Sequence, residues 1–227
     1  MANLPFVLEK LRTNNPKSVI TQGYLRSDVL LTASNANITF PFLLAQLQTT
    51  VKCMPIQPGD AFCICAWALK IYKSADTGAA TAGNISQTVD YSYPNPNVFT
   101  KSGEASNLES LFNGYLKIIM NNNVINSQYP AYKFRRVNTS QKGSQTGVAA
   151  GPIYSTVSSE EQNFVSNGLV ALEPTINFLG NWNFQAQLIP PAALDLTGTA
   201  STNYVSLILD GFLIQQGALS QDSFKGL

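Results

Sequence analysis

The sequence predicts an all-β protein, an antiparallel β-sandwich of about eight to ten strands. Short apolar runs recur along its 227 residues and alternate with clusters of Gly, Pro, Asn and Ser, which is the pattern of strands joined by turns. Twelve Phe, nine Tyr and twelve Pro residues fit the same class. The hydrophobic fraction of 44% can supply a core, and a charged fraction of only 12% argues against a disordered chain.

Residues 1–18 are predicted to form an N-terminal arm or a short helix, ahead of a single β-sandwich domain at residues 19–227. Pro5 suits a first helical position, and Leu4, Leu8 and Leu11 share one helical face. The sequence Asn14-Asn15-Pro16 would end such a helix. An arm that lies across a neighbouring subunit fits the residues equally well, and no sequence feature decides between the two.

The strongest strand signal is the run from Ala61 to Tyr72, which follows the turn residues Pro58-Gly59. It is apolar on both faces until near its end, so we expect it to lie between two layers or to present one face to another subunit. Within it, Cys63 and Cys65 should point to the same face. We interpret them as small buried hydrophobic residues, since three cysteines cannot all pair and a metal site would lack a fourth ligand.

One short helix is predicted from Glu104 to about Phe112, with an apolar face and with Asn113-Gly114 as its stop. A hairpin follows, in which residues 115–120 and 124–125 flank the turn Asn121-Asn122-Asn123. Asn tolerates the left-handed backbone that tight hairpins require. The other predicted strands are residues 29–32, 38–44, 132–137, 168–172, 175–179, 184–189 and 204–209, the last continuing to 214. Long loops are expected at residues 74–88 and 138–152.

The chain contains no histidine, whereas Asn and Gln make up about a seventh of it. The absence of histidine excludes Ser-His-Asp and Cys-His nucleophile systems, imidazole general bases and most zinc sites. The remaining candidate carboxylates, Asp60, Asp90, Asp195 and Asp210, are all expected at turns or strand ends, where Asp usually caps or bends the backbone. We therefore expect a structural or binding protein rather than an enzyme, with no cofactor, no metal and no small-molecule substrate.

The amino terminus shows no basic stretch followed by an apolar one, and no run reaches the ~18 apolar residues of a membrane-spanning helix. We therefore expect neither a secretory signal nor a membrane span, and synthesis in a host cytoplasm.

Charge is distributed unevenly along the chain. Residues 110–159 hold five basic residues and no acid, whereas residues 160–227 hold six acids and one lysine. Lys133, Arg135 and Arg136 alternate with aromatic residues, so they are candidates for a nucleic-acid patch. A strand with an apolar inner face and a charged outer face explains the same pattern and is favoured. A second set, Lys10, Arg12 and Lys17, is a candidate for facing a genome or a membrane.

Trp182, flanked by Asn181 and Asn183, is a candidate glycan-contact site, because aromatic rings stack on sugars and amides bind hydroxyl groups. A core tryptophan at a corner of the sandwich is the favoured alternative.

Several segments resemble virion proteins of bacterial viruses, in particular capsid proteins of the jelly-roll type. They are FNGYLKI at residues 112–118, KFRRV at 133–137, FQAQLIPP at 184–191 and YVSLILDGFLI at 204–214. The resemblance implies a single jelly roll with elaborated loops and a structural protein of the virus particle that self-assembles into a capsid or its capsomers. Its implied partners are copies of itself, other virion proteins, and a genome or an internal membrane on the inner face. The family implies no catalytic residues.

A second function remains open from the sequence. The same composition suits a carbohydrate- or receptor-binding β-sandwich module of a phage or a surface adhesin. In that case Trp182 and its flanking amides would contact the ligand.

Overall fold

A computed structural model describes residues 4–42, 56–74, 92, 94, 104–135, 168–197 and 202–215. The described residues form eight strands, two α-helices and two short 3-10 helices, and the predicted all-β class is confirmed. The strands are β1 (Val19–Leu30), β2 (Ile38–Pro41), β3 (Ala61–Ser74), β4 (Tyr115–Met120), β5 (Asn123–Pro130), β6 (Val170–Leu179), β7 (Phe184–Ile189) and β8 (Thr202–Gln215). The helices are α1 (Leu4–Asn14), α3 (Glu104–Glu109), η2 (Ser110–Asn113) and η3 (Ala131–Phe134).

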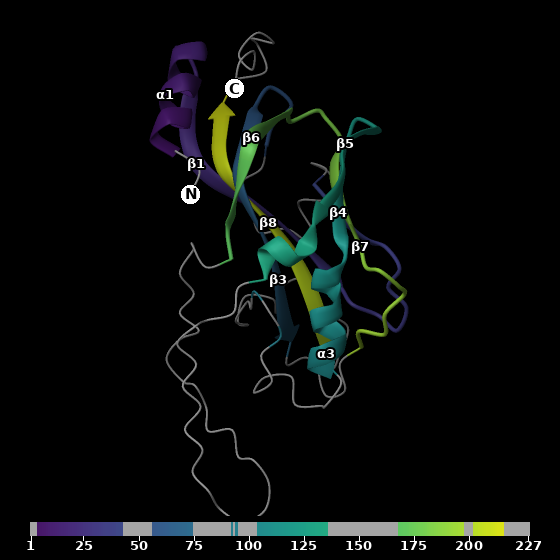
Figure 1. The fold of residues 1–227 in the computed structure, drawn as a ribbon. Helices are drawn as coiled ribbons and strands as arrows, with labels where there is room; N and C mark the ends of the chain where they lie inside the picture. The colour runs from purple at the N-terminus through teal and green to yellow at the C-terminus, as the bar shows by residue number, and fades with distance from the viewer. Residues whose placement is uncertain are drawn as a thin grey trace, which may run out of the picture.

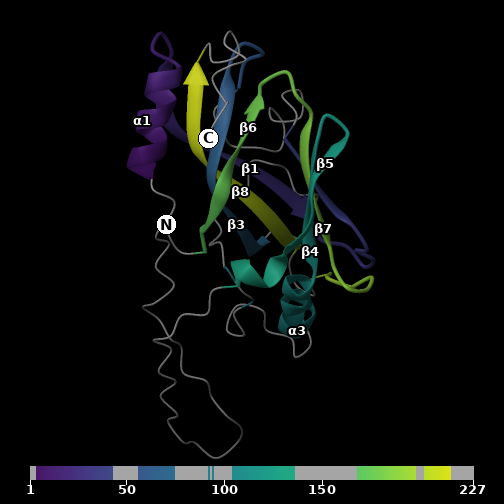
Figure 2. The ribbon, with the colours of Figure 1, turned by 45° about the horizontal axis from the view of Figure 1, so that its top comes forward.

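The strands form two four-stranded antiparallel sheets, with the orders β1-β8-β3-β6 and β2-β7-β4-β5. Their pairing is that of one long hairpin, in which β1 pairs with β8, β2 with β7, β3 with β6 and β4 with β5. The hairpin is rolled up, so that β8 also pairs with β3 and β7 also pairs with β4. Figures 1 and 2 show the two sheets facing each other, with the β4–β5 turn at one end of the molecule.

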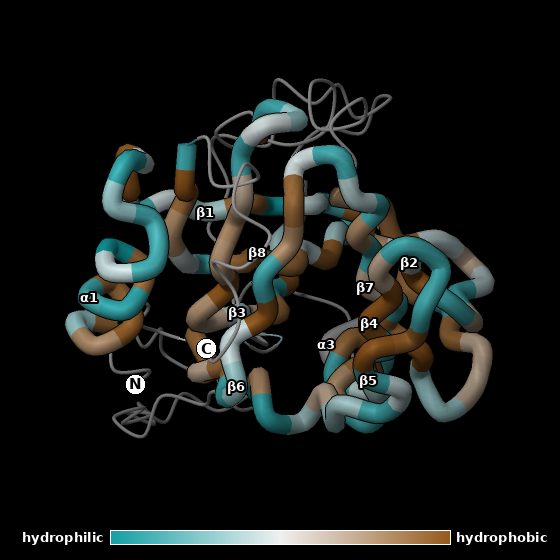
Figure 3. The backbone as a smooth tube through the Cα atoms, turned by 90° about the horizontal axis from the view of Figure 1, so that it is seen from above, coloured by the Kyte–Doolittle hydropathy of each residue, from teal (hydrophilic) through white to brown (hydrophobic). Residues whose placement is uncertain are grey.

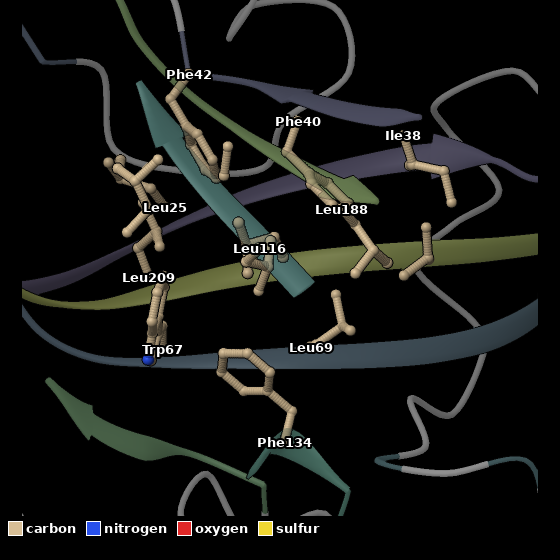
Figure 4. Close-up of a cluster of buried hydrophobic side chains, with 14 of the residues drawn as sticks. Leu25, Ile38, Phe40, Phe42, Trp67, Leu69, Leu116, Phe134, Leu188 and Leu209 are labelled. Atoms are coloured by element: carbon tan, nitrogen blue, oxygen red, sulfur yellow. The ribbon is translucent and has the colours of Figure 1, made fainter. Parts of the chain in front are cut away.

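The main hydrophobic core lies between the two sheets. Figure 4 shows side chains from both sheets pointing toward one another, among them Leu25, Trp67 and Leu209 from the first sheet and Leu116 and Leu188 from the second. All five are almost completely buried. Fully burying an aliphatic side chain of this size contributes about 1.5–3 kcal/mol, so these facing positions hold the two sheets together.

Aromatic contacts connect the two sheets at two places. Phe178 of β6 stacks on Phe184 of β7, with ring centroids 4.9 Å apart. At the second place, Trp67 of β3 contacts Tyr129 of β5 and Phe134 of η3 at 4.5 and 5.3 Å, both edge to face. The 3-10 helix η3 therefore closes the end of the core beside β3.

The β3 strand is apolar on both faces because a layer covers each of them. One face contributes to the core between the sheets, and Ala61, Cys63 and Cys65 on the other face pack with Val7 and Leu11 of α1. Figure 3 shows α1 on the side of this sheet that is turned away from the second sheet. The predicted N-terminal segment is thus a helix that packs on its own domain, and the predicted sandwiching of this strand between two layers is confirmed.

A bulge in β3 changes which alternate residues of the strand face the core. Its register with β8 shifts between Ile64 and Ala66, which is the signature of an extra residue in one strand. Opposite the bulge lies Gly211, where an added Cβ would come within 1.8 Å of the carbonyl oxygen of Cys63. Only glycine lets the two backbones approach this closely.

The predicted hairpin of β4 and β5 is confirmed, including its turn. Asn121 and Asn122 have φ values of 49° and 66°, and Met120 pairs with Asn123. Two successive left-handed residues form the type I′ turn, whose twist matches that of the flanking strands.

Other predicted elements differ from the structure. Residues 132–137 were expected as a strand, but η3 occupies 131–134, because the chain turns after Pro130 to bury Ala131 and Phe134. The segments 168–172 and 175–179 belong to one strand, β6, which contains the cis peptide bond Glu173-Pro174. The predicted helix at 104–112 is observed as α3 and η2, and α1 is a second α-helix. Of the loop predicted at 74–88, Ser74 is the last residue of β3 and the rest lies outside the described residues, as does the loop predicted at 138–152.

Replacing Gly211 with alanine should lower the free energy of unfolding by about 1–3 kcal/mol, because the new methyl group would force the bulge of β3 away from β8. Chemical denaturation measures the change. Gly59→Ala is the matched control, since nothing lies within 4 Å of its added Cβ, and it should change stability by less than about 0.5 kcal/mol. Equal effects of the two substitutions would contradict the close approach at Gly211.

Leu11→Ala should lower the free energy of unfolding by about 3 kcal/mol, because the side chain is fully buried between α1 and the sheet. The exposed neighbour Arg12→Ala is the control and should cost less than about 0.5 kcal/mol. A loss for Leu11→Ala as small as that of the control would show that α1 does not pack on its own domain.

Candidate functional site

The outer face of the β1-β8-β3-β6 sheet, the face turned away from the second sheet, has two different halves. Under α1 it is apolar, with Ile20, Phe212 and Ile214 in the cluster that packs on the helix. Farther along the same strands it carries a group of polar and aromatic side chains, which we call the outer cluster. Its members are Arg26 and Asp28 from β1, Tyr72 from β3, and Tyr204 and Ser206 from β8.

Arg26 lies at the centre of the outer cluster. Its Nε donates to Oδ1 of Asp28 at 2.8 Å and its Nη2 donates to Oγ of Ser206 at 3.0 Å. The guanidinium group also lies over the ring of Tyr72, 5.2 Å from the centroid. The side chains of Arg26 and Asp28 are only 16% and 5% exposed. Little water reaches two charged groups at this depth, so the pair is favourable only because its hydrogen-bond geometry is good.

The remaining members complete the contact between the three strands. The Ser206 hydroxyl donates to the carboxylate of Asp28. The rings of Tyr72 and Tyr204 stack at 4.9 Å and are nearly parallel, 5° apart. The Asp28 carboxylate thus accepts hydrogen bonds from both Arg26 and Ser206. The arrangement ties β1, β8 and β3 together, and its chemistry is that of a structural contact.

The two described cysteines lie in the apolar half of the same face. Cys63 and Cys65 are fully buried and reduced, with their sulfur atoms 4.0 Å apart. The neighbouring thiol of Cys63 and burial raise the pKa of Cys65. Cys65 therefore stays protonated at neutral pH, and a thiol in this form is a poor nucleophile. Their prediction as small buried hydrophobic residues is confirmed, and Cys53 lies outside the described residues.

The three described candidate carboxylates lie in different parts of the fold and have different hydrogen-bond partners. Asp60 accepts the backbone N–H of Gln57 in the turn before β3, and Asp195 accepts both the hydroxyl and the N–H of Thr197. Asp210 was expected at a strand end but lies inside β8, between Tyr24 and Ala66. Burial raises the pKa of the Asp210 carboxyl, and a hydrogen bond from Gln22 partly opposes this. Asp90 lies outside the described residues.

Of the basic residues in the segment 133–136, two are described, and they lie beside α3. Lys133 is exposed, and its Nζ lies 5.1 Å from the ring centroid of Tyr129. Arg135 forms an ion pair with Glu109, in which both side chains are more than 40% exposed. An exposed pair of this kind contributes little to stability and leaves the guanidinium open to solvent. Arg136 lies outside the described residues.

The N-terminal basic residues lie on α1 and the link that follows it. Arg12 and Lys17 are exposed, and the half-buried Lys10 extends over the ring of Phe6 at 4.8 Å. Figures 1 and 2 show α1 and α3 at opposite ends of the molecule. The structure therefore does not bring the two predicted sets of basic residues together.

Trp182 lies in the turn between β6 and β7. Its side chain is partly buried and packs against both the core between the sheets and the cluster under α1. The backbone of Asn183 makes two hydrogen bonds with Asn121. The Asn183 N–H donates to the side-chain Oδ1 of Asn121 at 2.9 Å, and the Asn121 N–H donates to the Asn183 carbonyl at 2.8 Å. Asn181 is exposed. The ring thus takes part in packing, and an open stacking platform is not formed at this turn.

Sequence reasoning missed the outer cluster. The alternation of Arg26 and Asp28 along one strand was visible, and it places both on the same face. Their partners Tyr72 and Ser206 are remote in sequence, and only the register of β8 with β1 and β3 brings them together.

Comparisons with known proteins add no identification. No family model matches the sequence, and no curated protein or solved structure matches the chain. Among the described residues, no helix has the length and apolar character to cross a membrane. Over the same residues, no group of three or more Cys, Asp or Glu side chains is arranged to hold a metal ion.

Asp210→Asn should stabilise the subunit at pH 7, by less than about 1 kcal/mol because the group is only half-buried. The pKa of this carboxyl is raised on folding, so its ionised form opposes folding above that pKa. The gain should disappear below about pH 4, where the carboxyl is protonated in both the folded and the unfolded state.

Thermal unfolding as a function of pH measures this effect. Asp195→Asn is the control of opposite sign, because hydrogen bonds from Thr197 lower the pKa of Asp195. That substitution should destabilise the protein at pH 7 and should become neutral in acid. The same sign for both variants at pH 7 would contradict the assignment.

Proposed function

We propose that this chain is a structural protein of a virus particle, which assembles through contacts with copies of itself into a capsid or its capsomers. The observation that carries the proposal is the strand order. A single hairpin rolled into the sheets β1-β8-β3-β6 and β2-β7-β4-β5 corresponds to the eight-stranded jelly roll, to which we assign the fold. Capsid domains are among the proteins built on this architecture, together with lectins and cupins.

The surface gives further support, because a shell protein must bury wide faces against its neighbours. Seven large hydrophobic side chains of the described residues are exposed: Phe6, Val19, Tyr24, Leu30, Val124, Ile125 and Tyr132. The charged fraction is low, and amide side chains can make hydrogen bonds without the cost of desolvating a charge. Repetition of modest contacts in a closed, symmetric assembly gives a stable shell.

Under this proposal the partners are copies of the chain, other virion proteins, and a genome or an internal membrane at the inner face. Because α1 and α3 lie far apart (Figures 1 and 2), at most one of the two basic sets would face the inside of a shell. The set beside α3, Lys133 and Arg135, combines basic groups with the exposed ring of Tyr132 and suits nucleic acid better.

The alternative of a glycan-binding module receives less support. Its candidate residue Trp182 packs on two clusters of its own domain, and Asn183 is tied to Asn121. Sugar-binding aromatic residues need an accessible face, which a partly buried ring at this turn offers only in part.

The mass of the purified protein in solution tests the proposal. Light scattering with electron microscopy should show closed particles or discrete ring-shaped capsomers, which dissociate when the protein is diluted. A monomer that persists at high concentration and in the presence of the other virion proteins would overturn it.

A further inference from the structure

Four strands form the edges of the two sheets: β1 and β6 in one, β2 and β5 in the other. An edge strand exposes N–H and C=O groups that can pair with another chain. Proteins usually blunt such edges with very short strands, with proline or with bulges. The four edges of this molecule differ sharply in these features.

Three of the edges carry such features. The β2 strand has four residues and ends at Pro41. The register of β5 with β4 shifts twice, and β5 ends at Pro130. The β6 strand contains Pro174, and its register with β3 shifts at the same level. None of the three offers a long regular edge.

The β1 strand has none of these features. Its twelve residues pair with β8 in an unbroken register from Val19 to Leu30, and it contains no proline. Three of the seven exposed large hydrophobic side chains lie on it, since Val19, Tyr24 and Leu30 are 59%, 50% and 44% exposed. Figure 3 shows β1 as the last strand of its sheet, beyond β8. A long, regular and apolar edge of this kind is suited to pairing with another strand.

The backbone groups of β1 that face this edge can be assigned. The Leu31 N–H donates to the carbonyl of Asn203, at 2.9 Å, in continuation of the β1–β8 register. In an antiparallel ladder, alternate residues direct their N–H and C=O groups to opposite sides. The odd-numbered residues therefore bond to β8, and the groups of Ile20, Gln22, Tyr24 and Leu30 point to the edge.

We propose that β1 pairs in antiparallel fashion with β1 of a second copy, across a twofold axis beside Leu25. The two four-stranded sheets would then join into one continuous sheet of eight strands. This inference rests on the proposed function, because it names one of the contacts through which the chain assembles. Its occupant is the same edge of an identical subunit, so the interface is isologous.

The chemistry of the side chains selects this register. Only the even-numbered residues of β1 direct their backbone N–H and C=O groups to the edge. In the pair, even-numbered residues of one copy must therefore lie opposite even-numbered residues of the other. With the axis beside Leu25, Ile20 lies opposite Leu30 of the partner subunit, and Gln22 lies opposite Asp28 of the partner subunit. Tyr24 lies opposite Arg26 of the partner subunit. The first pair is apolar with apolar, a favourable cross-strand combination. The Asp28 carboxylate and the Arg26 guanidinium keep the contacts within their own subunit, where their side chains are only 5% and 16% exposed. Gln22 and Tyr24 of the partner subunit would lie beside this ion pair without replacing its partners.

The neighbouring register is poorer. With the axis beside Tyr24, the apolar Ile20 would lie opposite Asp28 of the partner subunit, and Leu30 would lose its apolar partner. In the proposed register the side chains of Arg26 and Asp28 keep their contacts with each other and with Ser206 inside their own subunit. The outer cluster would thus lie beside the twofold axis and stiffen the edge before it pairs.

Disulfide trapping tests the register. In the double variant Ile20→Cys, Leu30→Cys, mild oxidation with diamide should join the two introduced thiols of neighbouring subunits, with loss of two electrons and two protons. A covalent dimer on a non-reducing gel is the expected result. Leu30→Cys alone is the matched control, because the two Leu30 positions would lie about 33 Å apart, ten residues at ~3.3 Å each. No dimer of the double variant beyond that of the control would overturn the proposal.

A charge variant tests the same contact without a new bond. Tyr24→Lys would place an ammonium group opposite Arg26 of the partner subunit, twice in each interface, and should reduce trapping by about 5- to 30-fold. Tyr132→Lys is the control, because Tyr132 is 63% exposed but lies on η3, away from β1. Equal trapping in the two backgrounds would contradict pairing through β1.

The outcomes separate this inference from the proposed function. If the double cysteine variant forms particles but no cross-link between positions 20 and 30, and if Tyr24→Lys leaves particle formation unchanged, the β1 contact would be overturned and the proposed assembly would stand. A trapped dimer from a protein that never forms larger particles would support the β1 contact and overturn the virion role.

Discussion

The structure depends on the burial of the β3–β8 pair on both faces. These are the two longest strands, and they lie side by side in the middle of the first sheet. Leu69 and Leu207 point into the space between the sheets, while Cys63 and Phe212 point to the opposite side. A strand with two apolar faces is stable in water only if a layer covers each one. The second sheet covers one face, and α1 covers the apolar half of the other.

From this constraint follow the local irregularities of the first sheet. The bulge at Cys65 lets β3 change which residues face the core, and Gly211 provides the space that the bulge needs. Beyond the reach of α1, the outer face changes from apolar packing to the outer cluster, where Arg26 pairs with Asp28 and contacts Tyr72. Buried charges of this kind are tolerated because each has a partner at hydrogen-bond distance. The same cluster fixes β1 to β8. The other edge of β1 pairs with no described strand.

Much of the fold could be predicted from local patterns. The run Ala61–Tyr72 predicted a central strand, Asn121-Asn122 predicted the tight turn, and Asn113-Gly114 predicted the end of a helix, because each depends on residues close together in sequence. The strand predicted at 132–137 is wrong over its described part, 132–135, since its partial alternation resembles a strand while Pro130 and the burial of Phe134 produce a 3-10 helix. The continuity of β6 across Pro174 was not predicted, because a proline inside an apolar run resembles a break between two strands.

The sequence by itself determined the all-β class, the absence of histidine chemistry and the positions of most strands, since these depend on composition and on short-range periodicity. Only the tertiary structure decided that the N-terminal segment packs as a helix on its own sheet, and that β1 is an edge strand of the described sheet. It also assembled the outer cluster from β1, β3 and β8 and separated the two sets of basic residues. These features depend on pairings between strands more than a hundred residues apart, such as Tyr24 with Asp210, whose register is set by the packing of the whole domain.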